Sequence, residues 1–262
     1  SDYKITDEIA ESGLEFTLYY QKKVTITAKS ATKQYDGTIL VLTGTSNSEK
    51  VTVEGLKEGH TLSSVEISYA NGETVEGLTG RLNAGVATVT PSAAIIKDST
   101  TNNEVSSNYY KVTYISGTLE VTKINVTVRV EPDRWTGATY NGTEYQTGFT
   151  NPSKSAADGS GYVMISNDAY ASMVYSEGVT YQQRIWNLVK SASVTGSNYE
   201  AVTYVDGAAG TGYVAISMAD VGDYTYSLGL TSADLPDGNG NYSVSLYVRS
   251  GRLQILPKAV TV

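Results

Sequence analysis

Residues 108–123 read NYYKVTYISGTLEVTK, and this stretch decides the fold. Apolar and polar residues alternate on both sides of Ser116 and Gly117, which is typical of two half-buried strands joined by a turn. The phrase returns at 241–258 as NYSVSLYVRSGRLQILPK and, in a shorter form, at 2–16 as DYKITDEIAESGLEF. Each copy predicts a β-hairpin with the glycine in its turn.

The copies of this phrase divide the chain into modules, because a short β run follows each of them, at 24–27, 126–128 and 260–262. We expect residues 1–23 to be the closing hairpin of a preceding repeat or an N-terminal extension, 24–123 and 124–258 to be two modules, and 259–262 to begin another. The second module is longer by roughly thirty residues, mostly between Thr150 and Tyr213, as an insertion into loops or extra strands would produce.

Two further phrases occur once in each module. Residues 35–37 (Tyr-Asp-Gly) and 140–142 (Tyr-Asn-Gly) predict tight turns, because Asp-Gly and Asn-Gly accept positive φ angles. We interpret both as turns of a repeated fold and not as binding loops. Residues 83–85 match 220–222, and the second copy continues to Tyr224 in the D-x-G-x-Y pattern of a tyrosine corner, a feature of immunoglobulin-like sandwiches.

The composition favours strands and turns over helices. The chain has 262 residues, rich in Thr, Ser, Val and Gly, with 21 Tyr against two Phe and two Trp. This length suits two domains, each able to bury a core. We therefore predict an all-β fold of tandem β-sandwich, immunoglobulin-like modules. The alternative is a β-grasp-like module with a short helix, for which residues 231–235 are the candidate.

The charge and cysteine content exclude several classes of partner. A net charge of −8 leaves no basic stripe for a nucleic acid or an anionic membrane. The absence of cysteine removes disulfides and thiolate metal sites. No apolar run reaches the roughly 20 residues that span a bilayer, so we expect no membrane insertion in this segment.

The order of these motifs resembles the MBG/YDG-type immunoglobulin-like repeats of large surface proteins and adhesins of gut Firmicutes. The resemblance rests on the turns at 35–37 and 140–142, the segment Glu58 to Leu62, the phrases at 83–85 and 220–222, and the closing hairpins. It implies an extracellular, wall-attached, monomeric rod of repeats that contacts its neighbouring repeats and a host glycoprotein or polysaccharide. The resemblance brings no catalytic residues and no cofactor.

The residues themselves point away from an enzyme. His60 is the one histidine of the chain, and it lies in Glu-Gly-His-Thr, where an exposed turn residue is expected. No pair of carboxylates stands out. Residues 237–241 (DGNGN) start like a calcium loop, but Tyr242 replaces the required Gly and Val248 stands where a Glu is needed, so we predict a plain turn. We expect no catalytic residue and no metal site.

Aromatic residues of the second module are the candidates for binding a ligand, because sugar-binding clefts use exposed aromatic faces. The candidates are Trp135, Tyr170, Tyr175, Tyr181 and Tyr213. The alternative is that these tyrosines pack on half-buried sheet faces in place of Phe. Trp186 lies in the alternating run 184–190, where a strand would place it on the same side as Leu188 in the core.

We therefore expect a non-catalytic repeat segment of a bacterial cell-surface adhesin or stalk. Two alternatives stay open: a carbohydrate- or mucin-binding module, and accessory domains of a larger secreted enzyme. A bond between Lys and Asn, or between Thr and Gln, would stiffen a stalk without cysteine, but the spacing of the residues does not identify one.

Overall fold

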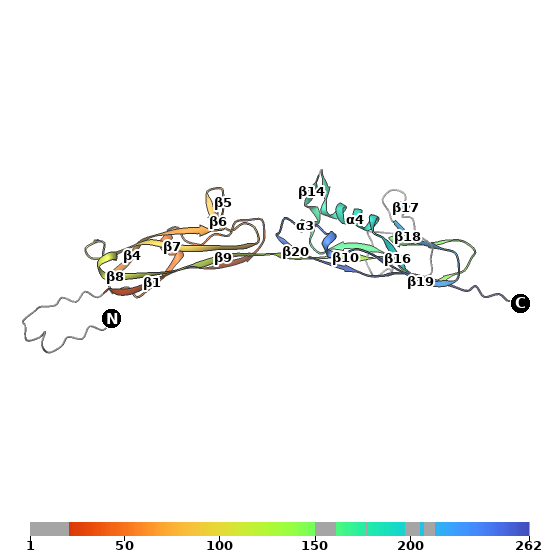
Figure 1. The fold of residues 1–262 in the computed structure, drawn as a ribbon, viewed down its shortest axis with the longest axis horizontal. Helices are drawn as coiled ribbons and strands as arrows, with labels where there is room; N and C mark the ends of the chain where they lie inside the picture. Colours follow the sequence, from red (N-terminus) through yellow and green to blue (C-terminus); the bar gives the residue numbers. More distant parts are fainter. Residues whose placement is uncertain (1–20, 150–160, 177, 197–204, 207–212, 262) are drawn as a thin grey trace, which may run out of the picture. The chain divides into compact units, whose positions relative to one another are not determined.

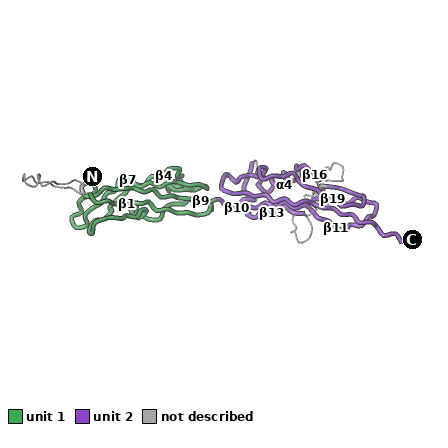
Figure 2. The backbone as a smooth tube through the Cα atoms, turned by 60° about the horizontal axis from the view of Figure 1, so that its bottom comes forward, with its two compact units in different colours: residues 1–122 green, residues 123–262 purple. Residues whose placement is uncertain are grey.

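The computed structural model describes residues 21–149, 161–176, 178–196, 205–206 and 213–261. The chain forms two compact units, residues 1–122 and 123–262 (Figure 2). Strands dominate the described part of both units, so the fold is all-β and sandwich-like, as predicted. The copy of the closing phrase at 2–16 lies outside the described residues.

The described part of unit 1 consists mainly of strands (Figure 1). Its described elements are β1 (Lys22–Ala28), β2 (Ala31–Gln34), η1 (Asn47–Lys50), β3 (Val51–Glu54), β4 (His60–Ala70), β5 (Glu73–Val75), β6 (Leu78–Gly80), β7 (Gly85–Asp98), α2 (Ser106–Tyr109), β8 (Tyr110–Ile115) and β9 (Gly117–Thr122).

Two sheets and a small hairpin make up the described part of unit 1. One sheet has the order β3-β1-β8, the other has the order β2-β9-β7-β4, and β5 pairs with β6. Alternating residues of β1 are buried, among them Val24 and Ile26. They share a core cluster with Val65 of β4 and Ile96 of β7, so the two sheets pack face to face.

The closing phrase of unit 1 is not a hairpin, and this prediction was wrong. In the described pairings β8 pairs with β1, whereas β9 pairs with β2 and β7. One strand thus passes from the first sheet to the second at Ser116 and Gly117. Gly117 does not form a turn, because its φ is not positive. It is needed because two backbones approach closely here: a Cβ at this position would meet the carbonyl oxygens of Ala28 and Lys29.

The described residues of unit 2 form more elements than those of unit 1, including two α-helices (Figure 1). They are β10 (Ile124–Glu131), β11 (Arg134–Thr139), β12 (Tyr145–Phe149), β13 (Tyr162–Ile165), α3 (Asp168–Ser172), β14 (Val174–Ser176), β15 (Val179–Thr180), α4 (Tyr181–Ser191), β16 (Val194–Gly196), β17 (Val205–Asp206), β18 (Tyr213–Met218), β19 (Gly222–Leu228), η4 (Ser232–Asp234), β20 (Tyr242–Val248) and β21 (Gly251–Leu256).

The sheets of unit 2 repeat the connections of unit 1. One sheet has the order β13-β10-β20 and another the order β11-β21-β19-β16. In unit 1, β1 and β2 lie in different sheets, and in unit 2 the first strand likewise changes sheets between β10 and β11. The last strand of unit 2 changes sheets between β20 and β21. The closing phrase is therefore not a hairpin here either. Strands β12, β18 and β17 form a third sheet, and β14 pairs with β15.

Equivalent strands also pair in the same register. Gly85 faces Val121 in unit 1, and Gly222 faces Ile255 in unit 2. Tyr224 follows two residues after Gly222, and its hydroxyl donates a hydrogen bond of 3.1 Å to the carbonyl oxygen of Asp220. This contact confirms the predicted tyrosine corner in the second unit.

Helix α4 lies where the sequence predicted an alternating strand over 184–190, and that prediction was wrong. Thr180 caps the helix: its hydroxyl accepts from the N–H of Gln183, whose side chain accepts from the N–H of Thr180. Tyr181, Ile185 and Val189 are buried at a spacing of four residues, which is the period of a helix.

The change of period moves Trp186 away from Leu188, because residues two apart lie on different faces of a helix. The ring of Trp186 packs edge to face against Phe149 of β12, with centroids 5.7 Å apart. The segment 231–235, the candidate for a helix, contains the single 3₁₀ turn η4. Within the described residues no helix is long and apolar enough to cross a membrane.

Candidate functional site

Two of the predicted ligand-binding tyrosines form a buried cluster in unit 2. Tyr170 of α3 lies between Tyr181 of α4 and Tyr242 of β20, with ring centroids 4.9 and 5.2 Å away. The Tyr170 side chain is fully buried, and its hydroxyl donates to the carbonyl oxygen of Pro236 at 2.5 Å. Burial raises the pKa of Tyr170 far above the ordinary value of a phenol. These rings fill the interior and offer no face to a sugar.

Tyr175 lies at the edge of the same cluster, with its ring centroid 6.0 Å from that of Tyr181. Its side chain is exposed, and the guanidinium of Arg184 sits 5.2 Å from its ring centroid. Tyr175 is therefore the member of this cluster whose ring reaches solvent.

Trp135 belongs to a different surface, on β11. Its side chain is 44% exposed and its ring meets the edge of Tyr145 at a centroid distance of 5.2 Å. The hydroxyl of Tyr145 donates to the carbonyl oxygen of Thr139, which holds that ring in place. Tyr213 begins β18 and pairs through its backbone with Phe149, and its side chain lies outside the described part of the chain.

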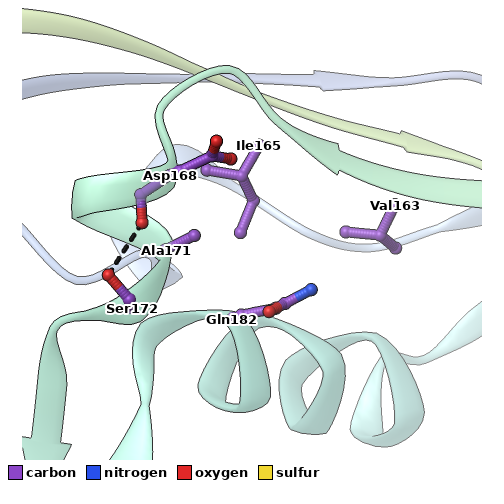
Figure 3. A pocket seen from close by; sticks show the side chains of 6 residues that line it. All are labelled: Val163, Ile165, Asp168, Ala171, Ser172 and Gln182. Carbon is purple, nitrogen blue, oxygen red and sulfur yellow. Dashed lines mark hydrogen bonds between the residues drawn. The ribbon is translucent and has the colours of Figure 1, made fainter.

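A small pocket lies between β13 and the helices α3 and α4 (Figure 3). Strand β13 and helices α3 and α4 line it with Val163, Ile165, Asp168, Ala171, Ser172 and Gln182. Its volume of about 210 Å³ is below the roughly 300 Å³ at which small-molecule sites begin. The hydroxyl of Ser172 donates to the backbone carbonyl of Asp168 at 2.8 Å, so this hydroxyl is used within the last turn of α3.

His60 is buried, which corrects the expectation of an exposed turn residue. It begins β4 and packs its ring against the rings of Tyr109 and Tyr110. Nδ1 lies 2.8 Å from the hydroxyl of Tyr110, which also accepts the N–H of Lys57, and Nε2 lies 3.7 Å from Asp98. His60 therefore packs against two tyrosine rings and lies near a carboxylate at the start of β4.

The Tyr-Asp-Gly and Tyr-Asn-Gly phrases form the predicted turns in matching geometry. Oδ1 of Asp36 accepts from the N–H and the hydroxyl of Thr38, and Oδ1 of Asn141 accepts from the same groups of Thr143. The following glycines have φ of +80° and +78°. Lys33 adds an ion pair of 2.6 Å to Asp36, and these contacts lower the pKa of Asp36 to about 2.

The loop at 237–241 is a turn, as predicted. The N–H of Asn239 donates to Oδ1 of Asp237, and the N–H of Asn241 donates to the carbonyl oxygen of Gly238. In the described part of the chain, no group of three or more His, Asp or Glu side chains is placed to hold a metal ion.

Sequence reasoning missed a charged group on the sheet β13-β10-β20. Glu131 is 4% exposed, and its carboxylate accepts the hydroxyl of Tyr162 at 2.7 Å and pairs with Arg249 at 2.9 Å. Arg129, on the same face of β10, lies 4.7 Å from the ring centroid of Tyr247. These residues are far apart in the sequence, and only the pairing of β10 with β13 and β20 brings them together.

No protein-family model and no curated protein sequence matches this chain.

Proposed function

We propose that the chain is a non-catalytic, tension-resisting spacer segment of an extracellular, wall-attached adhesin or stalk protein. The observation behind this proposal is that, within the described part of each unit, the first and last strands lie side by side and run parallel. In unit 1, β1 pairs with β8 from Lys22↔Tyr110 to Thr27↔Ile115, and β2 pairs with β9 from Ala31↔Leu119 to Gln34↔Thr122.

Unit 2 has the same parallel pairs at its ends. Strand β10 pairs with β20 from Ile124↔Tyr242 to Val130↔Val248, and β11 pairs with β21 from Arg134↔Arg252 to Thr139↔Leu256. In both units the first and last strands therefore pair with each other in each of the two sheets that they cross.

This geometry supports a spacer, because parallel strands place the start of the unit and its end at opposite ends of the ladder. Residues 22–34 of unit 1 span roughly 40 Å at the usual rise of a strand. Each such unit therefore adds length to a chain of repeats, whereas a module whose ends meet would add little.

The same geometry resists tension. A pull on both ends of a unit drives the first and last strands in opposite directions along their common axis. The evenly spaced hydrogen bonds of the parallel ladder are then loaded together and not one after another. Removal of β1 also exposes Val24 and Ile26, which are fully buried, so the pull works against burial as well.

The bend where the strand changes sheets is held by hydrogen bonds in unit 2. Asp133 is 5% exposed, and its carboxylate accepts the N–H groups of Gly148 and Gly161. Its own N–H donates to the carbonyl oxygen of Gly148, and its carbonyl oxygen accepts the N–H of Arg252. The first strand therefore cannot slide at this point without losing several bonds together.

The absence of cysteine makes a direct test of tension resistance simple. Attachment points at Lys23→Cys and Lys123→Cys load the strands of unit 1 in shear. Lys23→Cys with Lys111→Cys pulls at two facing residues and opens the same ladder from one end. All three lysines are exposed, so we expect the variants to keep the fold. We expect a higher unfolding force for the first pair in single-molecule pulling, and equal forces would contradict the proposal.

The place of the segment in a cell is tested by the full open reading frame. A wall-sorting signal together with further copies of the repeat supports a stalk or adhesin. A catalytic domain in the same reading frame supports the alternative, in which these units are accessory domains of a secreted enzyme.

A further inference from the structure

We propose that the outer face of the sheet β13-β10-β20 in unit 2 binds a sugar that carries a carboxylate, with Arg129 as the anchor. Val126, Val128 and Val130 of β10 are fully buried, so the alternate residues Thr127 and Arg129 point away from the core. The proposal concerns a surface that is separate from the predicted aromatic candidates and from the spacer role.

Arg129 is held in position by the ring of Tyr247 and by an ion pair with Glu131. Its guanidinium lies 4.7 Å from the ring centroid of Tyr247, and its Nε lies 3.8 Å from Glu131, beyond hydrogen-bond distance. Within the described residues the side chain of Arg129 makes no hydrogen bond, and it is 41% exposed. A guanidinium has five N–H donors in a planar fork that fits a carboxylate. Stacking on Tyr247 reduces the entropy that binding would cost.

The local charge favours an anion, although the whole chain carries a net charge of −8. The groups that face Arg129 across the sheet are Met164 on β13, Tyr247 on β20, and the neighbouring Glu131 and Arg249. The carboxylate of Glu131 is already bound by Tyr162 and Arg249. Among these described residues, two guanidiniums and one carboxylate leave one positive charge.

The rest of the face suits a sugar better than a simple anion. On one side of Arg129, about 7 Å along the strands, Thr127 lies between the hydroxyls of Ser166 and Ser245. Beside Arg129 itself, the side chains of Met164 and Tyr247 are exposed to 43% and 45%. A carboxylate-bearing sugar presents a charge for the guanidinium, hydroxyls for the polar row and an apolar ring face for Tyr247.

Unit 1 supplies an internal comparison at the same register. Thr27 of β1 pairs with Ile115 of β8 and Thr52 of β3, as Arg129 pairs with Tyr247 and Met164. The equivalent face of unit 1 thus has neither the guanidinium nor the aromatic ring. We expect it not to bind the same ligand.

The test is an NMR titration of the whole chain with the methyl glycosides of glucuronic acid and N-acetylneuraminic acid. Methyl glucoside and sodium acetate serve as neutral-sugar and simple-anion probes. We expect amide shifts on β10, β13 and β20 with at least one acidic sugar, and not on β1, β3 and β8. Arg129→Thr, which installs the residue of unit 1, should weaken binding by about tenfold or more.

Arg252→Thr is the matched control, because Arg252 is a partly exposed arginine that pairs with Asp223 on another sheet. It should leave the affinity unchanged, and unchanged spectra outside the site will show that both variants fold. The proposal fails if no acidic sugar binds, if Arg129→Thr binds as well as the natural chain, or if acetate binds as tightly as the sugars. The last result would mean an anion site without sugar recognition.

Discussion

Tyr226 and Gly251 face each other across β19 and β21, and the tyrosine ring lies over the glycine. A Cβ at 251 would collide with the ring of Tyr226, which is 1% exposed and cannot swing into solvent. The glycine of the closing phrase therefore provides space for a core side chain at the point where the last strand changes sheets.

Gly251→Ala should destabilise unit 2 by about 1 to 3 kcal/mol, the usual cost of overpacking a core. Urea unfolding measures this loss. Gly229→Ala is the control, because its φ is not in the left-handed region and its nearest neighbour, the carbonyl oxygen of Ser193, lies at an ordinary 3.6 Å. Equal stability of the two variants would mean that the ring of Tyr226 is not fixed over residue 251.

Tyr110→Phe should destabilise unit 1 by about 1 to 3 kcal/mol, because it leaves the N–H of Lys57 and Nδ1 of His60 without their partner. Thermal or urea unfolding reports the change. Tyr109→Phe, in the same ring cluster but 47% exposed, should have little effect. If the two variants lose the same stability, the hydroxyl of Tyr110 has no special role.

Unit 2 should lose stability as the pH rises above 10. Burial raises the pKa of Tyr170 in the folded state above its unfolded value near 10, so folding favours the neutral phenol. The resulting stabilisation is complete below pH 10 and declines as the pH rises toward the folded-state pKa. The free energy of unfolding, measured from pH 8 to 11.5, should therefore fall less steeply for Tyr170→Phe. Parallel curves for the two proteins would contradict this assignment.

The aromatic candidates can be tested without confusing binding with folding. Tyr181 is 4% exposed, so Tyr181→Ala should destabilise unit 2 by about 3 kcal/mol or more and is a poor test of binding. Trp135→Ala and Tyr175→Ala remove exposed rings and should leave the unfolding midpoint within a few degrees. If either ring is a sugar platform, its variant will lose binding on a glycan array of mucin sugars. If the natural chain binds no sugar on the array, this prediction is wrong.

Local patterns predicted local structure well. The alternation around Gly117 and Gly251 predicted strands on both sides of each glycine, and the Asp-Gly and Asn-Gly pairs predicted turns. The D-x-G-x-Y pattern predicted the contact of Tyr224. Each of these depends on residues within a few positions of one another, which a sequence displays directly.

Three predictions failed where distant segments decide the outcome. The run 184–190 alternates, but the capping box at Thr180 and the burial of Tyr181, Ile185 and Val189 favour a helix. His60 follows a glycine, as a turn residue would, but β8 brings Tyr110 against it. The closing hairpins failed because the strand on each side of the glycine has a better partner elsewhere.

The sequence by itself determined the all-β class, the repeated strands and the positions of the turns, because alternation and turn chemistry act over a few residues. The tertiary structure alone decided which strands pair, and it placed the first strand of each unit parallel to the last. It also placed Arg129 beside Tyr247, residues that are separated by most of unit 2. Strand pairing is set by which faces can be buried together, and that depends on the whole chain.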